Sequence, residues 1–257
     1  MRALATLLLA AVALPAAALD PERALAVSQA AIGRQVSDHV LVRADGTTLR
    51  LSELAGVPLV VSLVYTGCYR ICPTTTRHLL RMARLARKAL GPGRFKVLVI
   101  GFDTAQDTPE AMQVYARKQG AAGEPDWLFL SADARTARAL ARELGFVYEP
   151  SPRGFDHLLQ VSVLDGERRV YRQVYGDAFT APQLVEPLKE LALGRRADKG
   201  LLAHLADRVR LFCTTYDPST GAYRFDYSLF IGLTIAALIL LSTLAFLVHE
   251  LRRRGAS

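Results

Sequence analysis

Two cysteines, Cys68 and Cys72, stand close together where a predicted strand gives way to a predicted helix. The apolar, β-branched run 57–65 before them is typical of a buried strand, and a helical pattern follows from residue 74 to about residue 90. Two thiolates so close together have two main chemical uses, which are soft-metal binding and disulfide exchange. The structural alternative is a disulfide that staples the fold, or a pair of buried thiols.

The local sequence indicates how both sulfurs are presented. The C-x3-C spacing covers about one helical turn, so both side chains can face the same side of a helix. Pro73 suits the first position of that helix, where its missing N–H group costs nothing. Unpaired N–H groups at a helix start stabilise anions, so we expect both thiols to ionise more readily than free cysteine does.

The elements that must position these residues alternate between strand and helix. The patterns predict a hairpin at 39–51, strands at 57–65, 95–102 and 127–130, helices at 74–90, 109–119, 134–144 and 180–193, and a second hairpin formed by 158–164 and 168–174. Residues 20–37 are predicted to be a mixed lead-in, and residues 149–156 an irregular loop with two prolines and a glycine. This order predicts an α/β fold, a thioredoxin-like sandwich with a central mixed sheet flanked by helices.

A third metal ligand must come from elsewhere in the chain, which contains five histidines. His157 lies just before the last predicted hairpin, in a loop that a thioredoxin-like sheet places beside the cysteine loop, so it is the best candidate by position. Two thiolates and one imidazole suit copper in either oxidation state, and three ligands leave a position open for transfer to a partner. The alternative is a loop histidine whose bonding partner is Asp156.

Three motifs in a fixed order carry a specific resemblance to a known family. They are Y-T-G-C-x3-C-P, then G-F-D-T-A-Q-D-T-P-E, then F-D-H before a hairpin strand. Together they resemble the Sco/SenC family of copper chaperones over roughly residues 36–193. The resemblance implies a thioredoxin fold and one copper ion, Cu(I) or Cu(II), held by Cys68, Cys72 and His157. It also implies assembly of the binuclear copper centre of cytochrome c oxidase, with the copper-bearing subunit as client and other periplasmic copper carriers as further partners.

Three acidic residues are candidates for supporting the site. Asp103 and Asp107 match the acidic D-x3-D-T-P segment of the family, which the resemblance places near the metal. Asp156 is a candidate for orienting the ring of His157. Asp107 is equally well explained as a cap of the helix that begins near residue 109.

The sequence also departs from the family pattern at several points. Leu158 follows the histidine where a small polar residue is frequent, and Tyr69, Arg70 and Ile71 lie between the cysteines where a proline and an acidic residue are common. The family's usual anchor is N-terminal, whereas the candidate anchor here is C-terminal. These departures concern metal affinity and client identity rather than the fold.

Two functions from different classes use the same cysteine pair. A metallochaperone binds and delivers copper without turnover, whereas a thiol–disulfide reductase keeps the cysteines of an oxidase subunit reduced so that copper can enter. Only the first function needs His157. A peroxide-scavenging thioredoxin relative is a third hypothesis, and the paired C-x3-C argues against it.

Both ends of the chain carry apolar segments that indicate export and anchoring. Residues 1–18 have a positive start, an apolar stretch and an A-x-A end, which predicts a signal peptide, with a retained membrane anchor as the alternative. Residues 228–249 run about 22 residues without a charge, enough to cross a bilayer, with a buried core helix as the alternative. The arginines in the tail 250–257 predict that it is cytoplasmic. The signals together predict a single-pass protein of the bacterial inner membrane whose domain faces the periplasm.

The charge distribution excludes nucleic acids as partners. The 257 residues carry a net charge of +8, but the basic residues are not interleaved with aromatics, so nucleic-acid binding is not expected.

Residues 194–227 are predicted to form a membrane-proximal helix and a turn-rich loop that contains Cys213, the third cysteine. Cys213 could be a free thiol, an intermolecular disulfide partner or a resolving cysteine.

Overall fold

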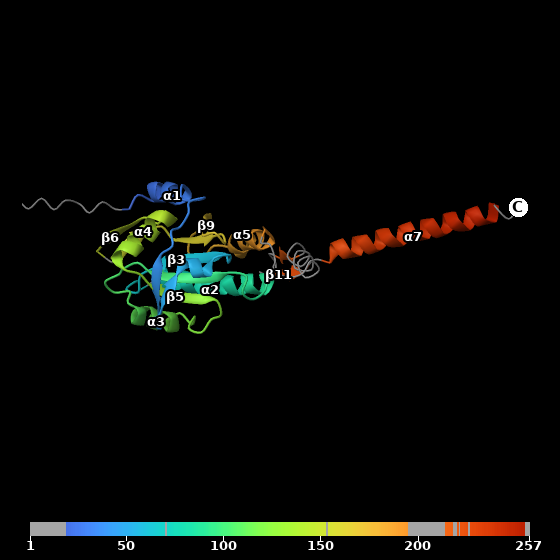
Figure 1. The fold of residues 1–257 in the computed structure, drawn as a ribbon. Coiled ribbons are helices and arrows are strands. Elements are labelled where there is room, and N and C mark those ends of the chain that lie inside the picture. The colour runs from blue at the N-terminus through green and yellow to red at the C-terminus, as the bar shows by residue number, and fades with distance from the viewer. Residues whose placement is uncertain are drawn as a thin grey trace, which may run out of the picture.

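A seven-stranded mixed sheet lies at the centre of the domain in the computed structural model, which describes residues 19–69, 71–152, 154–194, 214–217, 220, 222–225 and 227–254 (Figure 1). The strand order is β2-β1-β5-β4-β3-β8-β9. These strands are β1 (Val40–Arg43), β2 (Thr48–Arg50), β3 (Leu59–Val64), β4 (Lys96–Gly101), β5 (Trp127–Ser131), β8 (Gln160–Leu164) and β9 (Val170–Tyr175). The predicted α/β fold with a central mixed sheet flanked by helices is confirmed.

Strand β3 has neighbours on both sides and is buried along its whole length. Its side chains are apolar on both faces except for Ser62, as expected for a strand covered on both sides. It pairs in parallel with β4 and antiparallel with β8, and β4 pairs in parallel with β5. The C-terminal ends of β3, β4 and β5 therefore meet at one edge of the sheet, and the cysteine turn follows β3 at that edge.

Helices flank this sheet and pack against one another. They are α1 (Pro21–Gln29), α2 (Ile71–Leu90), α3 (Pro109–Lys118), α4 (Ala134–Leu144) and α5 (Ala181–Gly194), with a 3-10 turn η1 (Leu51–Leu54) after β2. α2 packs against α5, and α3 packs against β5. α1 lies beside the C-terminal end of α4, where Gly145 has a φ of 65° and a Cβ would come within 2.7 Å of the Val27 carbonyl oxygen (Figure 1). Only glycine allows this close approach.

Two predictions about the N-terminal half prove wrong. The lead-in at 20–37 contains the helix α1, which starts with a strong signal because the Asp20 side chain accepts hydrogen bonds from the N–H groups of Glu22 and Arg23. The helix after the cysteines begins at Ile71, so Pro73 is its third residue rather than its first. A proline is tolerated there because the first four N–H groups of a helix have no partner within it.

The prediction of an irregular loop at 149–156 is also wrong. The residues form an antiparallel hairpin of β6 (Tyr148–Ser151) and β7 (Gly154–His157) outside the main sheet. Pro150, opposite Phe155, is compatible with pairing because a two-stranded ribbon consists of edge strands, where a missing donor can face solvent. His157 therefore ends a strand, directly opposite Tyr148.

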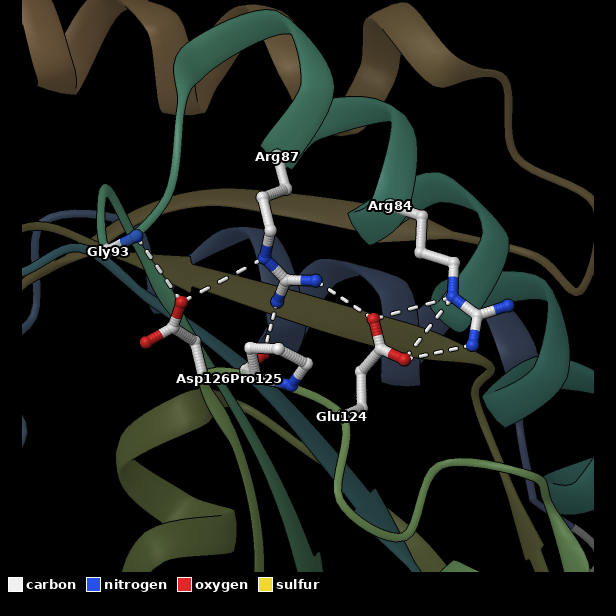
Figure 2. Close-up of polar contacts among 6 residues, drawn as sticks. All are labelled: Arg84, Arg87, Gly93, Glu124, Pro125 and Asp126. Atoms are coloured by element: carbon white, nitrogen blue, oxygen red, sulfur yellow. Dashed lines mark hydrogen bonds and ion pairs between the residues drawn. The ribbon is translucent and has the colours of Figure 1, made fainter.

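Charged side chains fasten α2 to the segment before β5 (Figure 2). Glu124 accepts hydrogen bonds from Arg84 and Arg87 at distances as short as 2.8 Å, and the Arg87 guanidinium also reaches Asp126 at 3.8 Å. The carboxylate of Asp126 in turn accepts a hydrogen bond from the N–H of Gly93 at 3.3 Å. The polar face of this basic helix is thus partly neutralised, and the helix end far from Cys72 is held against the sheet.

The C-terminal part contains a second small hairpin and a long helix. β10 (Thr214–Asp217) and β11 (Ala222–Phe225) pair where a turn-rich loop was predicted, and α7 runs from Ser228 to Arg254. Within the described part of the chain, no helix is both long and apolar enough to cross a membrane, so the predicted span stays a prediction. The predicted signal peptide, Cys213 and residues 195–213, where the membrane-proximal helix was predicted, lie outside the described residues.

Candidate metal centre

Cys68 and Cys72 lie at the sheet edge, one before and one inside the first turn of α2. Cys72 is buried, with 3 % of its surface exposed, whereas Cys68 is half-buried. Neither cysteine forms a disulfide, and the N–H group of Cys72 donates a hydrogen bond to Sγ of Cys68 at 3.3 Å. The sulfur of Cys68 therefore occupies the place of a helix cap and satisfies one of the N–H groups that a helix start leaves unpaired.

The low pKa that the helix start predicts for both thiols is not found at Cys72. The side-chain hydrogen bond to Cys68 and then burial raise the pKa of the Cys72 thiol well above its ordinary value. The expectation that both thiols ionise readily is therefore wrong for Cys72. A helix N-terminus stabilises an anion only weakly, whereas removing a thiolate from water is costly.

Asp107 fixes the turn that carries Cys68. Its carboxylate accepts hydrogen bonds from the N–H and hydroxyl of Thr66, both at 2.7 Å, and from the N–H of Asp103 at 2.9 Å. Burial raises the pKa of Asp107 in spite of these bonds. The helix cap is Thr108, whose hydroxyl accepts from the N–H of Ala111, so Asp107 is not the cap. Asp107 instead joins the loop after β4 to the cysteine turn.

His157 lies in an aromatic enclosure at the same edge. Its ring centroid is 5.2 Å from that of Phe146, 6.0 Å from Phe102 and 6.3 Å from Tyr65. Burial among these rings lowers the pKa of His157. Its Nδ1 lies 3.1 Å from the carbonyl oxygen of Leu158. A carbonyl can only accept, so Nδ1 carries the hydrogen, and Nε2 of the neutral ring keeps the lone pair that a metal needs.

One pocket contains both Cys68 and His157. It has a volume of about 260 Å³, and its lining residues are Leu19, Tyr65, Cys68, Ile71, Phe155, Asp156, His157 and Leu159. The hydroxyl of Tyr65 accepts a hydrogen bond from the N–H of Phe155 at 3.5 Å, and burial raises the pKa of Tyr65 to about 12. Tyr65 thus joins the cysteine turn to the β6–β7 hairpin. The sequence motif contained Tyr65, but nothing in the sequence pattern alone indicated that role.

The other two acidic candidates, Asp156 and Asp103, have different roles from the predicted one. Asp156 is exposed and lines the pocket, but the hydrogen-bond partner of His157 Nδ1 is the carbonyl of Leu158. Asp103 is half-buried, and its N–H group donates to Asp107. Asp103 thus takes part in the same anchoring loop as Asp107.

Cys68, Cys72 and His157 carry donor atoms that suit a soft metal, but their side chains are not gathered around one point in the structure. Among the described residues, no three His, Cys, Asp or Glu side chains are grouped closely enough to hold a metal ion. Cys68 and Cys72 are adjacent, and His157 faces the same pocket as Cys68. Two sulfurs and a neutral imidazole with apolar surroundings are the donors that copper prefers. The residues present therefore fit copper by their chemistry.

Comparison with known proteins gives a consistent picture. The SCO1/SenC family model matches residues 28–193. A candidate electron transfer protein from Aquifex aeolicus VF5 is 28% identical, covering 66% of this chain and 99% of that chain with a TM-score of 0.58. No curated protein matches the chain.

Two structures that contain copper share the fold. Arabidopsis thaliana ScoI with copper bound is 18% identical, covering 60% of this chain and 96% of that chain with a TM-score of 0.52. Bradyrhizobium japonicum ScoI with copper bound is 20% identical, covering 61% of this chain and 99% of that chain with a TM-score of 0.52. At these identities the likeness concerns the fold alone.

Proposed function

The chain belongs to the SCO1/SenC family, and from that premise we propose that it binds copper and delivers it to the copper-bearing subunit of cytochrome c oxidase during assembly. The observation that carries this proposal is the pocket shared by Cys68 and His157, beside which the main-chain N–H of Cys72 donates a hydrogen bond to Sγ of Cys68. Family membership adds support, as do the two copper-bound structures that share the fold.

Three side chains would hold the ion, which is cargo rather than a resident cofactor. Cys68 and Cys72 would bind as thiolates and His157 through Nε2. Two sulfurs favour Cu(I), and the imidazole helps to hold Cu(II). Since Cys72 holds its proton firmly, loading with copper must displace that proton, and copper affinity should rise with pH. Three donors from the protein leave room for a ligand of the receiving subunit.

Apolar side chains form much of the wall of the pocket. Tyr65, Phe155 and Leu159 wall it on the side of the hairpin, and Ile71 lies on the side of α2. Apolar walls limit the competition of water for the metal and disfavour a net charge in the site. Two thiolates and one Cu(I) together carry a single negative charge, which is less costly to enclose than two free thiolates.

We also propose that the domain is exported and anchored. The signal-like residues 1–18, the uncharged run 228–249 and the arginines of the tail support a domain in the periplasm and a tail in the cytoplasm. Within the described residues of α7, Leu233, Leu240 and Leu241 are each more than 60 % exposed. Protease protection in spheroplasts, with the domain accessible from outside, tests this placement.

A thiol–disulfide reductase is the second candidate, favoured by the asymmetry of the pair. Cys68 is accessible, whereas Cys72 is buried and protonated, as suits an attacking and a resolving thiol. The Cys68 thiolate would attack a disulfide of the client, and a client thiolate would leave. Cys72, after losing its proton, would then attack Cys68 and release the second client thiol. The client gains two electrons, and the chain leaves with a Cys68–Cys72 disulfide that a separate dithiol donor must reduce.

One experiment separates the two functions. The full chain, purified in detergent with its thiols reduced, is loaded with copper, freed of excess metal and analysed for copper and protein. The delivery proposal expects nearly one copper per chain, and sulfur-to-Cu(II) charge-transfer absorption in the oxidised form. Reduction of a disulfide-containing peptide from the oxidase subunit, without stable copper uptake, would support the reductase instead.

A further inference from the structure

A groove lined by arginines lies between α1 and α4, away from the pocket that contains Cys68. It has a volume of about 760 Å³, and its floor is apolar, with Val27, Ala141, Phe146 and Val147 among the lining residues. Four arginines, Arg34, Arg135, Arg138 and Arg142, also line it, and all four are exposed. A groove that combines four guanidinium groups with an apolar floor suits a ligand that is both anionic and partly apolar.

These arginines are poorly neutralised by the protein itself. None of the four forms an ion pair among the described residues, in contrast to Arg84 and Arg87, which both bond Glu124 (Figure 2). The Arg34 guanidinium donates to the carbonyl oxygens of Arg142 and Ala30 and so is fixed at the helix ends.

The acidic groups on the same helix are already engaged. Asp133 accepts hydrogen bonds from the N–H groups of Arg135 and Thr136 at the start of α4. Glu143 accepts from Ser37 and contacts His39 on another side of the helix. The Asp133 carboxylate also interacts electrostatically with Arg135. Because none of the four arginines forms an ion pair among the described residues, the groove still carries a net positive charge.

The spacing of the arginines matches an extended peptide better than a single small anion. Arg135, Arg138 and Arg142 are spaced by three and four residues, so they lie on one face of α4 and span about 10 Å along it. In a peptide in the extended polyproline II conformation, which has three residues per turn, two carboxylates three residues apart point to the same side and lie about 9 Å apart. A lone phosphate would reach one end of this row only.

The groove is joined to the metal site through its floor. Phe146 lines the groove, and the same ring lies 5.2 Å from the ring of His157. Tyr148, at the end of the groove, is the strand partner of His157 in the β6–β7 hairpin. A chain segment seated in the groove would therefore place its neighbouring residues beside the hairpin that carries His157.

We propose that this groove binds an acidic, partly apolar segment of the protein that receives the copper, and so positions that protein beside His157. The partner class rests on the proposed delivery function, whereas the anion-binding groove itself does not. Arg135 and Arg142, at the two ends of the row, would hold carboxylates of the segment by paired hydrogen bonds, with Arg138 between them, and an apolar side chain of the segment would rest on Phe146 and Val147.

The test measures peptide binding to the full chain in detergent by fluorescence anisotropy. The probe is a fluorescein-labelled peptide with two aspartates three residues apart and a leucine between them. Arg135→Ala/Arg138→Ala removes two charges from the groove, and Arg117→Ala/Lys118→Ala removes two exposed charges from α3 as the matched control. Alanine is the best helix former, and the midpoint of thermal unfolding checks the fold of each variant. Arg138→Gln, which keeps most of the side-chain bulk, gives a second test.

We expect wild type and the α3 control to bind the peptide equally, and Arg135→Ala/Arg138→Ala to bind it about tenfold or more weakly. A peptide with asparagines in place of the aspartates should not compete. Equal binding by the groove variant, or equal weakening in the α3 control, would overturn the proposal. Competition by inorganic phosphate or glycerol phosphate as strong as that of the acidic peptide would also overturn it, in favour of a phosphate or lipid-headgroup site. Copper content, measured on the same samples, reports separately on the delivery function.

Discussion

The main-chain N–H group of Cys72 donates a hydrogen bond to Sγ of Cys68 at 3.3 Å. This contact places the two sulfurs at the start of α2 in unequal roles. Cys68 is accessible from the pocket, whereas Cys72 is buried beneath it. A metal ion, or the disulfide of a partner protein, would therefore reach Cys68 before Cys72.

Alkylation of the reduced protein should reveal this inequality. At pH 8 we expect Cys72 to react with iodoacetamide at least about tenfold more slowly than Cys68, because its raised pKa and burial limit both the thiolate fraction and access. Mass spectrometry of the labelled peptides measures both rates. In the denatured chain the rates should become similar, and equal rates in the folded chain would contradict the assigned geometry.

Loss of Asp107 should destabilise the fold and loosen the cysteine turn. Asp107→Ala leaves two N–H groups and a hydroxyl without their acceptor, and we expect a loss of about 2–4 kcal/mol in the free energy of unfolding. Chemical denaturation measures it. Asp133→Ala, which removes only the exposed cap of α4, should cost about 1 kcal/mol. Similar losses in both variants would mean that Asp107 is no more than a cap-like residue.

Gly154 should be sensitive to substitution because of Tyr65. It has a φ of 119°, and a Cβ at this position would lie 2.7 Å from the Tyr65 hydroxyl. We expect Gly154→Ala to cost about 1–3 kcal/mol from backbone strain, with a further cost from the clash, and to weaken copper retention. Gly176→Ala is the matched control, since it has a φ of 93° but nothing within 4 Å of the added Cβ. If thermal unfolding shows equal losses, contact with Tyr65 has no part in the effect.

The ion pairs of Glu124 should make stability depend on pH. Hydrogen bonds from Arg84 lower the pKa of Glu124 below its ordinary value of 4.5. The stabilisation is therefore present above about pH 4.5 and is lost as the pH falls through the folded-state pKa. We expect Glu124→Gln to lower the free energy of unfolding by about 1–2 kcal/mol at pH 7 and by less at pH 3.

Urea denaturation at both pH values measures this difference. Glu53→Gln, which removes a longer 4.0 Å contact with Arg43, should have almost no effect at either pH. A loss in Glu124→Gln that is the same at pH 3 and pH 7 would rule out an electrostatic cause.

What the sequence predicted correctly depended on local patterns. The strand, turn and helix around Cys68 and Cys72 follow from apolar runs and from helix periodicity, which act over a few residues. The hairpin at 39–51 and the hairpin formed by 158–164 and 168–174 were predicted for the same reason, since each has an Asp-Gly pair at its turn. The hairpin that carries His157 was missed because its stability comes from distant contacts, such as the hydrogen bond of Phe155 to Tyr65.

The pKa values and hydrogen bonds of the site residues were harder to predict than the identity of those residues. The raised pKa of Cys72 depends on its depth of burial and on the direction of the Cys68 side chain, which no local pattern encodes. Asp107 was assigned to the site because of the motif, but its bonds to Thr66 span 41 positions in the chain and required the fold. The groove beside the arginines of α4 could not be predicted, because Val27 of α1 and Phe146 line it together with that helix only in the folded chain.

The central claim is that Cys68, Cys72 and His157 converge on one copper ion. X-ray absorption spectroscopy at the copper edge of the loaded, reduced full chain tests it most directly, with His157→Ala as the comparison. We predict two sulfur neighbours and one imidazole nitrogen in the wild type, loss of the imidazole signal and of stable copper retention in His157→Ala, and nearly unchanged thiol exchange in that variant. An imidazole signal that persists in His157→Ala, or copper without sulfur neighbours in the wild type, would contradict the account.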